Sequence, residues 1–595
     1  MNSSILRTPC TALVATTSPN GLFASTPGRN RKEINVRKLG LSKAACLVLV
    51  FFASTAVLSS AQTNFNSLLS FNGDNGANPH FVTLVQGEDG QLYGTTLVST
   101  GSGGTVFKVT TGGTLTTLYT FCQGGEPCKY GAQPNAGLAQ NGNGDFYGTT
   151  MNGGANNDGT VFEIDSIGNL STLHSFDGTD GASPMVALSP SNNTANFYGT
   201  TSIGGTNNVG TVFQIDSALV FSSLHSFDGA DGDYPNVSLV QGANGNLYGA
   251  TVEGGASGGT GTFYEMTTSG GFTTQQTFKP AQVAGANGAL IQGNNGNFYG
   301  TDTGGGNGAG TIYEVTPEGE VSVLYTFCSK TDCTDGSTPY GALIIGSDGN
   351  FYGVTYAGGA NITECNAGCG TLFKITPAGK LTTLYSFCSQ AKCADGSQPE
   401  GGLLQDTNGI FYGTTYSGGT NGLGTIYSIS TATTQTPFVK TLPTSAKTGT
   451  TIIIMGNNLT GATQVLFNGI AAAFTVISST EIEAIVPAGA TTGPVTVVTP
   501  SGTLKTIVIF YVDVTPQIKN FTPKSGPVGT KVTITGVGLT QTTAVTFGGV
   551  AAGDFTVVSD KKVTATVPAD ATTGKIAITT PGGTATSTAS FTVTE

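Results

Sequence analysis

The sequence has no tryptophan and few histidines or charged side chains. Of its 595 residues three are His, and only 10% are Asp, Glu, Lys or Arg, against a usual share of about 25%. The scarcity of Glu, Lys and Arg excludes a protein built from long helices, because these residues favour helix surfaces. The lack of Trp means that any surface that stacks on sugars must use other aromatic rings, Tyr or Phe.

Glycine is present in excess. The chain holds 89 Gly among 595 residues, about twice the usual share of roughly 7%. Each Gly costs roughly 1 kcal/mol in a helix interior relative to Ala. Short runs of Val, Ile, Phe, Tyr and Thr lie between Gly, Asn and Asp clusters, which predicts an all-β protein of many short strands joined by tight turns.

The charge is unevenly distributed. Residues 1–61 hold seven of the 23 basic residues and one of the 35 acidic residues, so the remainder carries a formal charge of −18. Such an acidic surface repels phosphate groups, which argues against nucleic-acid and anionic-membrane partners and favours cations.

The N-terminus predicts export. Lys43 is followed by an apolar run at 44–58 and by the small residues Ser59-Ser60-Ala61. This run is shorter than the roughly 20 residues that span a bilayer, so we interpret 1–61 as a signal peptide with a long basic leader. An uncleaved anchor is the alternative. No later segment is apolar enough to cross a membrane, and we expect a secreted, extracellular or cell-surface bacterial protein.

Cysteine usage agrees with export. Outside the leader the cysteines form close pairs, and metal sites would usually show C-x-x-C spacing with histidines nearby. We therefore predict disulfides that shape small loops, with their connectivity left open. The eight cysteines are Cys122, Cys128, Cys328, Cys333, Cys365, Cys369, Cys388 and Cys393.

One unit recurs seven times along the chain. Each copy contains Phe-Tyr-Gly or Leu-Tyr-Gly, with Tyr at 93, 147, 198, 248, 299, 352 and 412, a mean period of about 53 residues. In the sixth copy we predict four strands, at 341–344, 351–355, 370–375 and 381–387. A four-stranded unit of this length favours a propeller blade over a helical or leucine-rich repeat.

The two ends of the array predict a closed ring. The seventh copy loses its pattern after 424–429, whereas residues 66–71 resemble an isolated fourth strand. Pairing these segments would remove the exposed edges of an open array. We therefore predict a seven-bladed β-propeller over 62–434, with a linear solenoid as the alternative. The lack of Trp argues against a WD-repeat propeller.

The LYGTT, GG and GT-V/I-F motifs of residues 66–430 resemble the GloVer tandem repeats of secreted bacterial proteins. This resemblance implies export and a repeat domain, and it brings no established activity.

After residue 435 the period changes to 80, so that Phe-Asn-Gly at 467–469 matches Phe-Gly-Gly at 547–549. Alternating strands and frequent turns predict two antiparallel sandwiches, at 435–513 and 514–595. Their motifs resemble the immunoglobulin-like IPT/TIG family, which implies spacers, stalks or accessory binding modules.

Acidic loops between copies could bind Ca²⁺ through carboxylate oxygens. None has EF-hand spacing, and the alternative is that Asp-Gly only forms the turn before Pro184 or Pro235. The candidate ligands are Asp177, Asp180, Asp228, Asp231 and Asp233.

Catalytic signals are weak. His174 and His225 occupy a position that is Tyr in other copies, which predicts packing, and nothing in the sequence pairs His80 with a nucleophile. Asp302 and Glu253 interrupt the repeat and are the weak candidates for the two carboxylates of a glycosidase.

We therefore expect an exported, non-enzymatic protein that binds a polysaccharide or a surface protein. Antiparallel order places the second-to-third-strand and fourth-to-first-strand loops on one face, which carries most of the unusual residues. The IPT/TIG-like modules would act as spacers or accessory binders. The alternatives are a secreted glycosidase or lyase and a self-associating adhesive protein. Ca²⁺ is the one cofactor proposed, and the oligomeric state is open.

Overall fold

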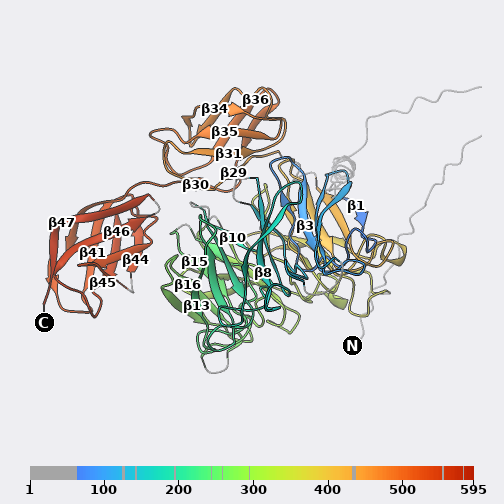
Figure 1. Ribbon diagram of the computed structural model, residues 1–595, viewed down its shortest axis with the longest axis horizontal. Helices are drawn as coiled ribbons and strands as arrows, with labels where there is room; N and C mark the ends of the chain where they lie inside the picture. The colour runs from blue at the N-terminus through green and yellow to red at the C-terminus, as the bar shows by residue number, and fades with distance from the viewer. Residues whose placement is uncertain are drawn as a thin grey trace, which may run out of the picture. The chain divides into compact units, whose positions relative to one another are not determined.

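The computed structural model describes residues 63–594, except 124–127, 141–143, 193–195, 243, 257–258, 294, 363, 432–436, 553–554 and 581. The predicted signal peptide lies outside these residues. The all-β prediction is confirmed for the described residues, which form strands and two short 3₁₀ helices, η1 (Thr331–Cys333) and η2 (Ala391–Cys393) (Figure 1). Within the same ranges, no helix has the length and apolar character needed to span a membrane.

The repeats form four-stranded antiparallel sheets, each ordered from its first to its fourth strand. The first strands are β2 (Val85–Gln86), β6 (Ala139–Gln140), β10 (Ser189–Pro190), β14 (Val240–Gln241), β18 (Ile291–Gln292), β22 (Ile344–Ile345) and β26 (Leu404–Gln405). The second strands are β3 (Leu92–Thr96), β7 (Phe146–Thr150), β11 (Phe197–Thr201), β15 (Leu247–Ala250), β19 (Phe298–Asp302), β23 (Phe351–Thr355) and β27 (Phe411–Thr415).

The third strands are β4 (Thr105–Val109), β8 (Thr160–Ile164), β12 (Thr211–Ile215), β16 (Thr262–Met266), β20 (Thr311–Val315), β24 (Thr371–Ile375) and β28 (Thr425–Ser430). The fourth strands are β5 (Leu115–Thr120), β9 (Leu170–Ser175), β13 (Phe221–Ser226), β17 (Phe272–Thr277), β21 (Val321–Thr326) and β25 (Leu381–Ser386). In the last sheet this place is taken by β1 (Asn64–Ser70), which pairs antiparallel with β28.

The first strands are shorter than the sequence analysis predicts. In the sixth copy we expected a strand at 341–344, whereas β22 begins at Ile344. Gly341 instead lies against the backbone of the following sheet, where an added Cβ would come within 2.8 Å of the Gly401 carbonyl oxygen. The segment that leads into each sheet therefore packs between sheets.

Contacts between neighbouring sheets explain the repeated Tyr-Gly motif. The Tyr93 ring packs on Phe146 of the next sheet, with ring centroids 4.0 Å apart. An added Cβ on Gly94 would lie 2.8 Å from the Phe107 ring, so Gly lets this third-strand ring cross the second strand. The last and first sheets are joined in the same way, because Tyr412 and Leu92 belong to one buried cluster.

The C-terminal part forms two β-sandwiches, each with its own apolar core. The first contains β29 (Lys440–Leu442), β30 (Ser445–Ala446), β31 (Thr451–Met455), β32 (Gln464–Phe467), β33 (Ile470–Ala471), β34 (Phe474–Val476), β35 (Glu481–Ile485), β36 (Val495–Thr499), β37 (Gly502–Lys505) and β38 (Tyr511–Val512). The second contains β39 (Gln517–Thr522), β40 (Ser525–Gly526), β41 (Lys531–Val537), β42 (Ala544–Phe547), β43 (Val550–Ala551), β44 (Phe555–Ser559), β45 (Lys562–Thr566), β46 (Gly574–Thr580) and β47 (Gly583–Val593).

Candidate functional site

Asp302, the first catalytic candidate, lies in the interior of the fifth sheet and has no exposed surface. Its Oδ1 accepts hydrogen bonds from the backbone N–H groups of Ala284 and Gly304, both at 3.2 Å, and the Thr311 hydroxyl donates to Oδ2. Burial raises the pKa of Asp302, and these hydrogen bonds oppose the rise. Glu253, the second candidate, is exposed and is not among these partners.

The other sheets show what Asp302 replaces. In the first sheet the Thr96 and Thr105 hydroxyls lie 2.8 Å apart, and the equivalent pair in the last sheet, Thr415 and Thr425, is 2.9 Å apart. Asp302 therefore occupies a conserved structural position of the repeat, where its carboxylate holds the loop that enters the fifth sheet.

The acidic loops use their carboxylates to hold turns. The backbone N–H of Asp177 donates to Asp180 Oδ1 at 3.0 Å, and that of Asp180 donates to Asp177 Oδ1 at 3.2 Å. His174 Nε2 lies 2.7 Å from Asp180 Oδ2, while the His174 ring stacks on Phe221 with centroids 3.6 Å apart. The third sheet repeats this arrangement with Asp228, Asp231 and His225.

These loops do not gather a metal-ligand set. Asp233 pairs with Glu253 through the backbone alone. Across the described part of the chain, the only group of three or more Cys, His, Asp or Glu side chains with ligand atoms close together is formed by four cysteines. The Ca²⁺ assignment therefore remains a sequence prediction.

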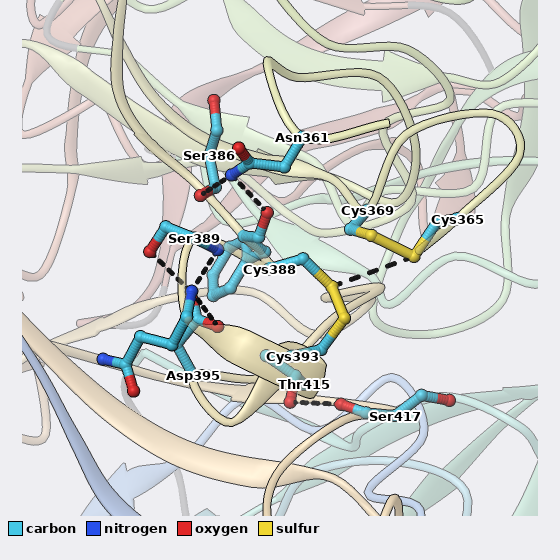
Figure 2. Close-up of a disulfide and its surroundings, with 12 residues drawn as sticks. Asn361, Cys365, Cys369, Ser386, Cys388, Ser389, Cys393, Asp395, Thr415 and Ser417 are labelled. Atoms are coloured by element: carbon cyan, nitrogen blue, oxygen red, sulfur yellow. Dashed lines mark hydrogen bonds between the residues drawn. A yellow bond between two sulfur atoms is a disulfide. The ribbon is translucent and has the colours of Figure 1, made fainter. Parts of the chain in front are cut away.

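The eight cysteines form four close-range disulfides, as predicted for the small loops. The pairs are Cys122–Cys128, Cys328–Cys333, Cys365–Cys369 and Cys388–Cys393. The last two lie side by side in the sixth repeat (Figure 2). They border a pocket of about 530 Å³, which we call the side pocket. Its lining includes Tyr356, Glu364, Cys365, Lys392, Cys393 and Gln398.

A second pocket, of about 70 Å³, is lined by the segments that enter all seven first strands, and we call it the central pocket. Several of its polar lining residues occupy the same position in different copies of the repeat. In six copies this position directly follows a proline. From the first to the seventh sheet its residues are His80, Asn135, Met185, Asn236, Asn287, Tyr340 and Glu400, of which the last five line the pocket.

Glu400 lines this pocket, and His80, which is not one of the lining residues, lies next to Glu400. Asn135 Nδ2 donates to the Met185 carbonyl at 3.3 Å, which turns Asn135 Oδ1 toward His80 Nδ1, 2.5 Å away. His80 Nδ1 therefore carries the proton, and the lone pair of Nε2 faces Glu400 Oε2 at 3.3 Å. The sequence analysis found no partner for His80, and the structure supplies one.

Burial makes this pair uncharged near neutral pH. It raises the pKa of Glu400 to about 8, because the carboxyl side chain is only 8% exposed. Burial also lowers the pKa of His80, although the contact with Asn135 opposes this. Glu400 Oε2 makes no hydrogen bond within the described residues, so a protonated Glu400 keeps its O–H as a donor and a neutral His80 keeps its Nε2 lone pair as an acceptor, without net charge.

Aromatic rings connect the two pockets. Tyr340, at the central pocket, lies edge-on to Tyr356 of the side pocket with ring centroids 5.6 Å apart. Phe81 lies 5.7 Å from Tyr340, and Tyr416 lies 5.4 Å from His80. We call Tyr340, Tyr356 and Tyr416 the tyrosine row.

Sequence reasoning missed Glu400 and the shared position that it occupies. The signal was present, because this position changes from His to Asn, Met, Tyr and Glu while the surrounding repeat keeps its motifs. Recognising it required knowing that the entering segments meet at one pocket.

Two family models match the chain. The Gloeobacter/Verrucomicrobia repeat matches residues 55–196, 188–363 and 242–473, and the IPT/TIG domain matches 437–510 and 516–594. No curated protein matches the sequence.

Solved structures show only partial likeness. SGBP-B from a xyloglucan utilization locus of Bacteroides uniformis is 26% identical over 26% of this chain and 48% of its own, with a TM-score of 0.16. Surface glycan-binding protein PbSGBP-B of Prevotella bryantii is 22% identical over 25% and 38%, with a TM-score of 0.17. The matches therefore span less than half the length of these two proteins. The BP39L lectin of Burkholderia pseudomallei is 11% identical over 62% and 95%, with a TM-score of 0.42.

Proposed function

The chain belongs to the Gloeobacter/Verrucomicrobia repeat family and carries two IPT/TIG domains, and we propose that it is an exported binding protein for an uncharged carbohydrate. The ligand would lie in the side pocket and along the tyrosine row, with a hydroxyl group at the His80–Glu400 pair. The observation that carries this proposal is the row of aromatic rings joining the two pockets beside that neutral pair.

The proposed architecture is one closed propeller of seven blades. The pairing of β1 with β28 supports it, as does the cluster that joins Tyr412 of the last sheet to Leu92 of the first. A pocket lined from all seven sheets fits a common axis. In such a ring the position of His80 and Glu400 recurs once per blade around the axis.

Pocket size decides where the ligand lies. Pockets for small molecules usually measure roughly 300–1000 Å³, so the side pocket, at about 530 Å³, can hold a sugar residue. The central pocket, at about 70 Å³, has room only for a small substituent. Tyr356 and Tyr340 lead from one pocket to the other and offer aromatic faces to the apolar faces of sugar rings.

The chemistry of the central pocket suits hydroxyl groups. Near pH 7 the O–H of neutral Glu400 is a donor at this pocket, the Nε2 of the adjoining His80 is an acceptor, and the buried Asn236 Oδ1 has no hydrogen-bond partner of its own. No Lys or Arg is among the described residues that line this pocket, and in the side pocket the one cationic lining residue, Lys392, is balanced by Glu364, so neither lining carries a net positive charge. An uncharged polysaccharide therefore fits better than a phosphorylated or acidic one.

The protein would bind its carbohydrate ligand without cleaving it. Glycosidases usually need a pair of carboxylates in one site, whereas among the described lining residues each pocket has a single carboxylate, Glu400 in the central pocket and Glu364 in the side pocket. The signal peptide predicted from the sequence of residues 1–61 would give a secreted or cell-surface location, and the IPT/TIG domains would act as spacers or accessory binders.

The test is a panel of soluble neutral and acidic polysaccharides, with retention measured by affinity electrophoresis. We expect the wild-type protein to be retarded by at least one neutral polysaccharide, and Tyr340→Ala to lose this retardation. Ile167→Ala is the matched control, because Ile167 is 78% exposed in the turn between β8 and β9, on the opposite face from the proposed site. Equal retardation of both variants would overturn the proposal.

The same panel tests the alternative enzyme. Reducing ends or unsaturated products that disappear in Glu400→Gln would make the protein a glycosidase or lyase. Size-exclusion chromatography of the wild-type protein tests the self-associating alternative.

A further inference from the structure

The sixth repeat carries two disulfides where other described repeats carry one or none. Cys388–Cys393 lies at the start of the loop between β25 and β26, in the position that Cys328–Cys333 occupies in the fifth repeat. Cys365–Cys369 comes from the long loop between β23 and β24, which brings it beside the first disulfide (Figure 2).

The sulfur atoms of the two disulfides are close enough to exchange partners. Cys365 Sγ lies 4.0 Å from Cys388 Sγ, and the four sulfur atoms all lie within 4.8 Å of one another. Cys365 is partly exposed, whereas the other three cysteines are buried. An external thiol therefore reaches this group most readily at Cys365.

We propose that these four cysteines form a disulfide-exchange site that accepts electrons from an external dithiol. A thiolate of the dithiol attacks Cys365 Sγ, and Cys369 leaves as a thiolate that takes a proton. The second thiol of the reductant then closes its own disulfide and releases Cys365 as a thiolate. Two electrons have passed from the dithiol to the protein.

The second step transfers the thiol within the protein. The Cys365 thiolate attacks Cys388 Sγ, so that the Cys365–Cys388 bond forms and the Cys388–Cys393 bond breaks. Cys393 leaves as a thiolate and takes a proton from water. This step conserves the number of disulfides, and the thiol moves from the exposed loop to the buried one.

Charges at the side pocket favour this direction. Lys392 precedes Cys393 and Glu364 precedes Cys365, and all four residues line the same pocket. A neighbouring ammonium group stabilises a thiolate, whereas a neighbouring carboxylate destabilises it. Cys393 is therefore the better leaving group.

Exchange would also alter the wall of the side pocket. The Cys393 carbonyl accepts hydrogen bonds from the backbone N–H groups of Gly396 and Gly419, both at 2.8 Å. Releasing Cys393 from Cys388 frees the segment that holds these contacts. The exchange site depends only on the positions of the four sulfur atoms, whether or not the pocket binds a carbohydrate.

The variant Cys369→Ser tests the second step without a reductant, because it leaves Cys365 with a free thiol. After incubation near pH 8, acid quenching and maleimide labelling in denaturant, we expect label on both Cys365 and Cys393. Trypsin cleaves after Lys392 and so separates Cys388 from Cys393 for mass spectrometry. Label confined to Cys365 would overturn the proposal.

The matched control is Cys333→Ser, which leaves Cys328 free in the equivalent loop of the fifth repeat. That disulfide does not belong to a cysteine cluster in the described structure, so label should stay on Cys328. If Cys369→Ser fails to fold, the wild-type protein with limiting dithiothreitol gives the answer. A Cys365–Cys388 bond in the partly reduced protein supports exchange, whereas its absence at every ratio of reductant contradicts it.

Discussion

The substitution Glu400→Gln tests the buried neutral pair through the pH dependence of stability. Between the ordinary Glu pKa of 4.5 and the folded value of about 8, the folded protein keeps a proton on Glu400 that the unfolded chain has released. Unfolding then releases a proton, so this contribution is complete below pH 4.5 and is lost as the pH rises to about 8. Gln is neutral throughout and lacks this dependence.

The expected effect is large. At about 1.4 kcal/mol per pKa unit, the shift corresponds to up to about 5 kcal/mol of wild-type stability lost between pH 4 and pH 9, relative to the variant. Burial lowers the pKa of His80 and raises the pKa of Glu400 to about 8, so His80 titrates while Glu400 is still neutral, and its contribution is similar in the two proteins. Glu400→Gln should therefore match the wild type near pH 4 and be more stable near pH 9.

Tyrosine fluorescence is the appropriate assay. The chain has no Trp, and Tyr511 is the only one of its 19 Tyr residues that lies after residue 430, so the signal comes almost entirely from the repeats. Urea unfolding at pH 4, 7 and 9 gives the difference in unfolding free energy. Parallel pH profiles for the two proteins would refute the reasoning.

Three further predictions concern the fold and the acidic loops. Asp302→Ala should lower repeat stability by roughly 2–3 kcal/mol because buried donors lose their acceptor, whereas Asp302→Thr, which copies the other sheets, should lose less in the same urea assay. An equal loss in both would contradict the structural role. Phe65→Ala should cost about 3 kcal/mol, because its ring stacks on Tyr385 with centroids 3.8 Å apart, and an unchanged urea midpoint would argue against β1 as part of the last sheet. EDTA should leave the melting temperature unchanged, because Asp177 and Asp180 already hold backbone N–H groups, and a fall would restore the Ca²⁺ assignment.

The order of strands and turns within a repeat could be predicted because it depends on residues that are close together in the sequence. The alternation of residues along the strands and the Gly-containing turns predicted the second and third strands of the sixth copy at 351–355 and 370–375. The observed strands β23 and β24 agree with these bounds to within one residue. The first strands are shorter than predicted, because the segments that lead into them pack against a neighbouring sheet, as Gly341 does against Gly401. Such a contact is invisible in a single copy of the repeat.

The candidate site was harder to predict for the same reason. Asp302 attracted attention as an exception in its motif, yet it replaces a buried threonine. His80 and Glu400 are 320 positions apart in the sequence and meet only when the first and last repeats come together. The sequence shows that His80 and Glu400 share one position in the repeat. Their contact follows only from the three-dimensional arrangement of the repeats.

The three histidines allow the most direct test of the central claim. In protein labelled with ¹³C-histidine, His80 reports on the central pocket through its contact with Glu400, while His174 and His225 report on the acidic loops. Titration with an oligosaccharide from the retarding polysaccharide should shift the imidazole signal of His80 and leave the other two in place. A saturating ligand that shifts His174 or His225 while His80 stays unchanged would contradict binding at the central pocket.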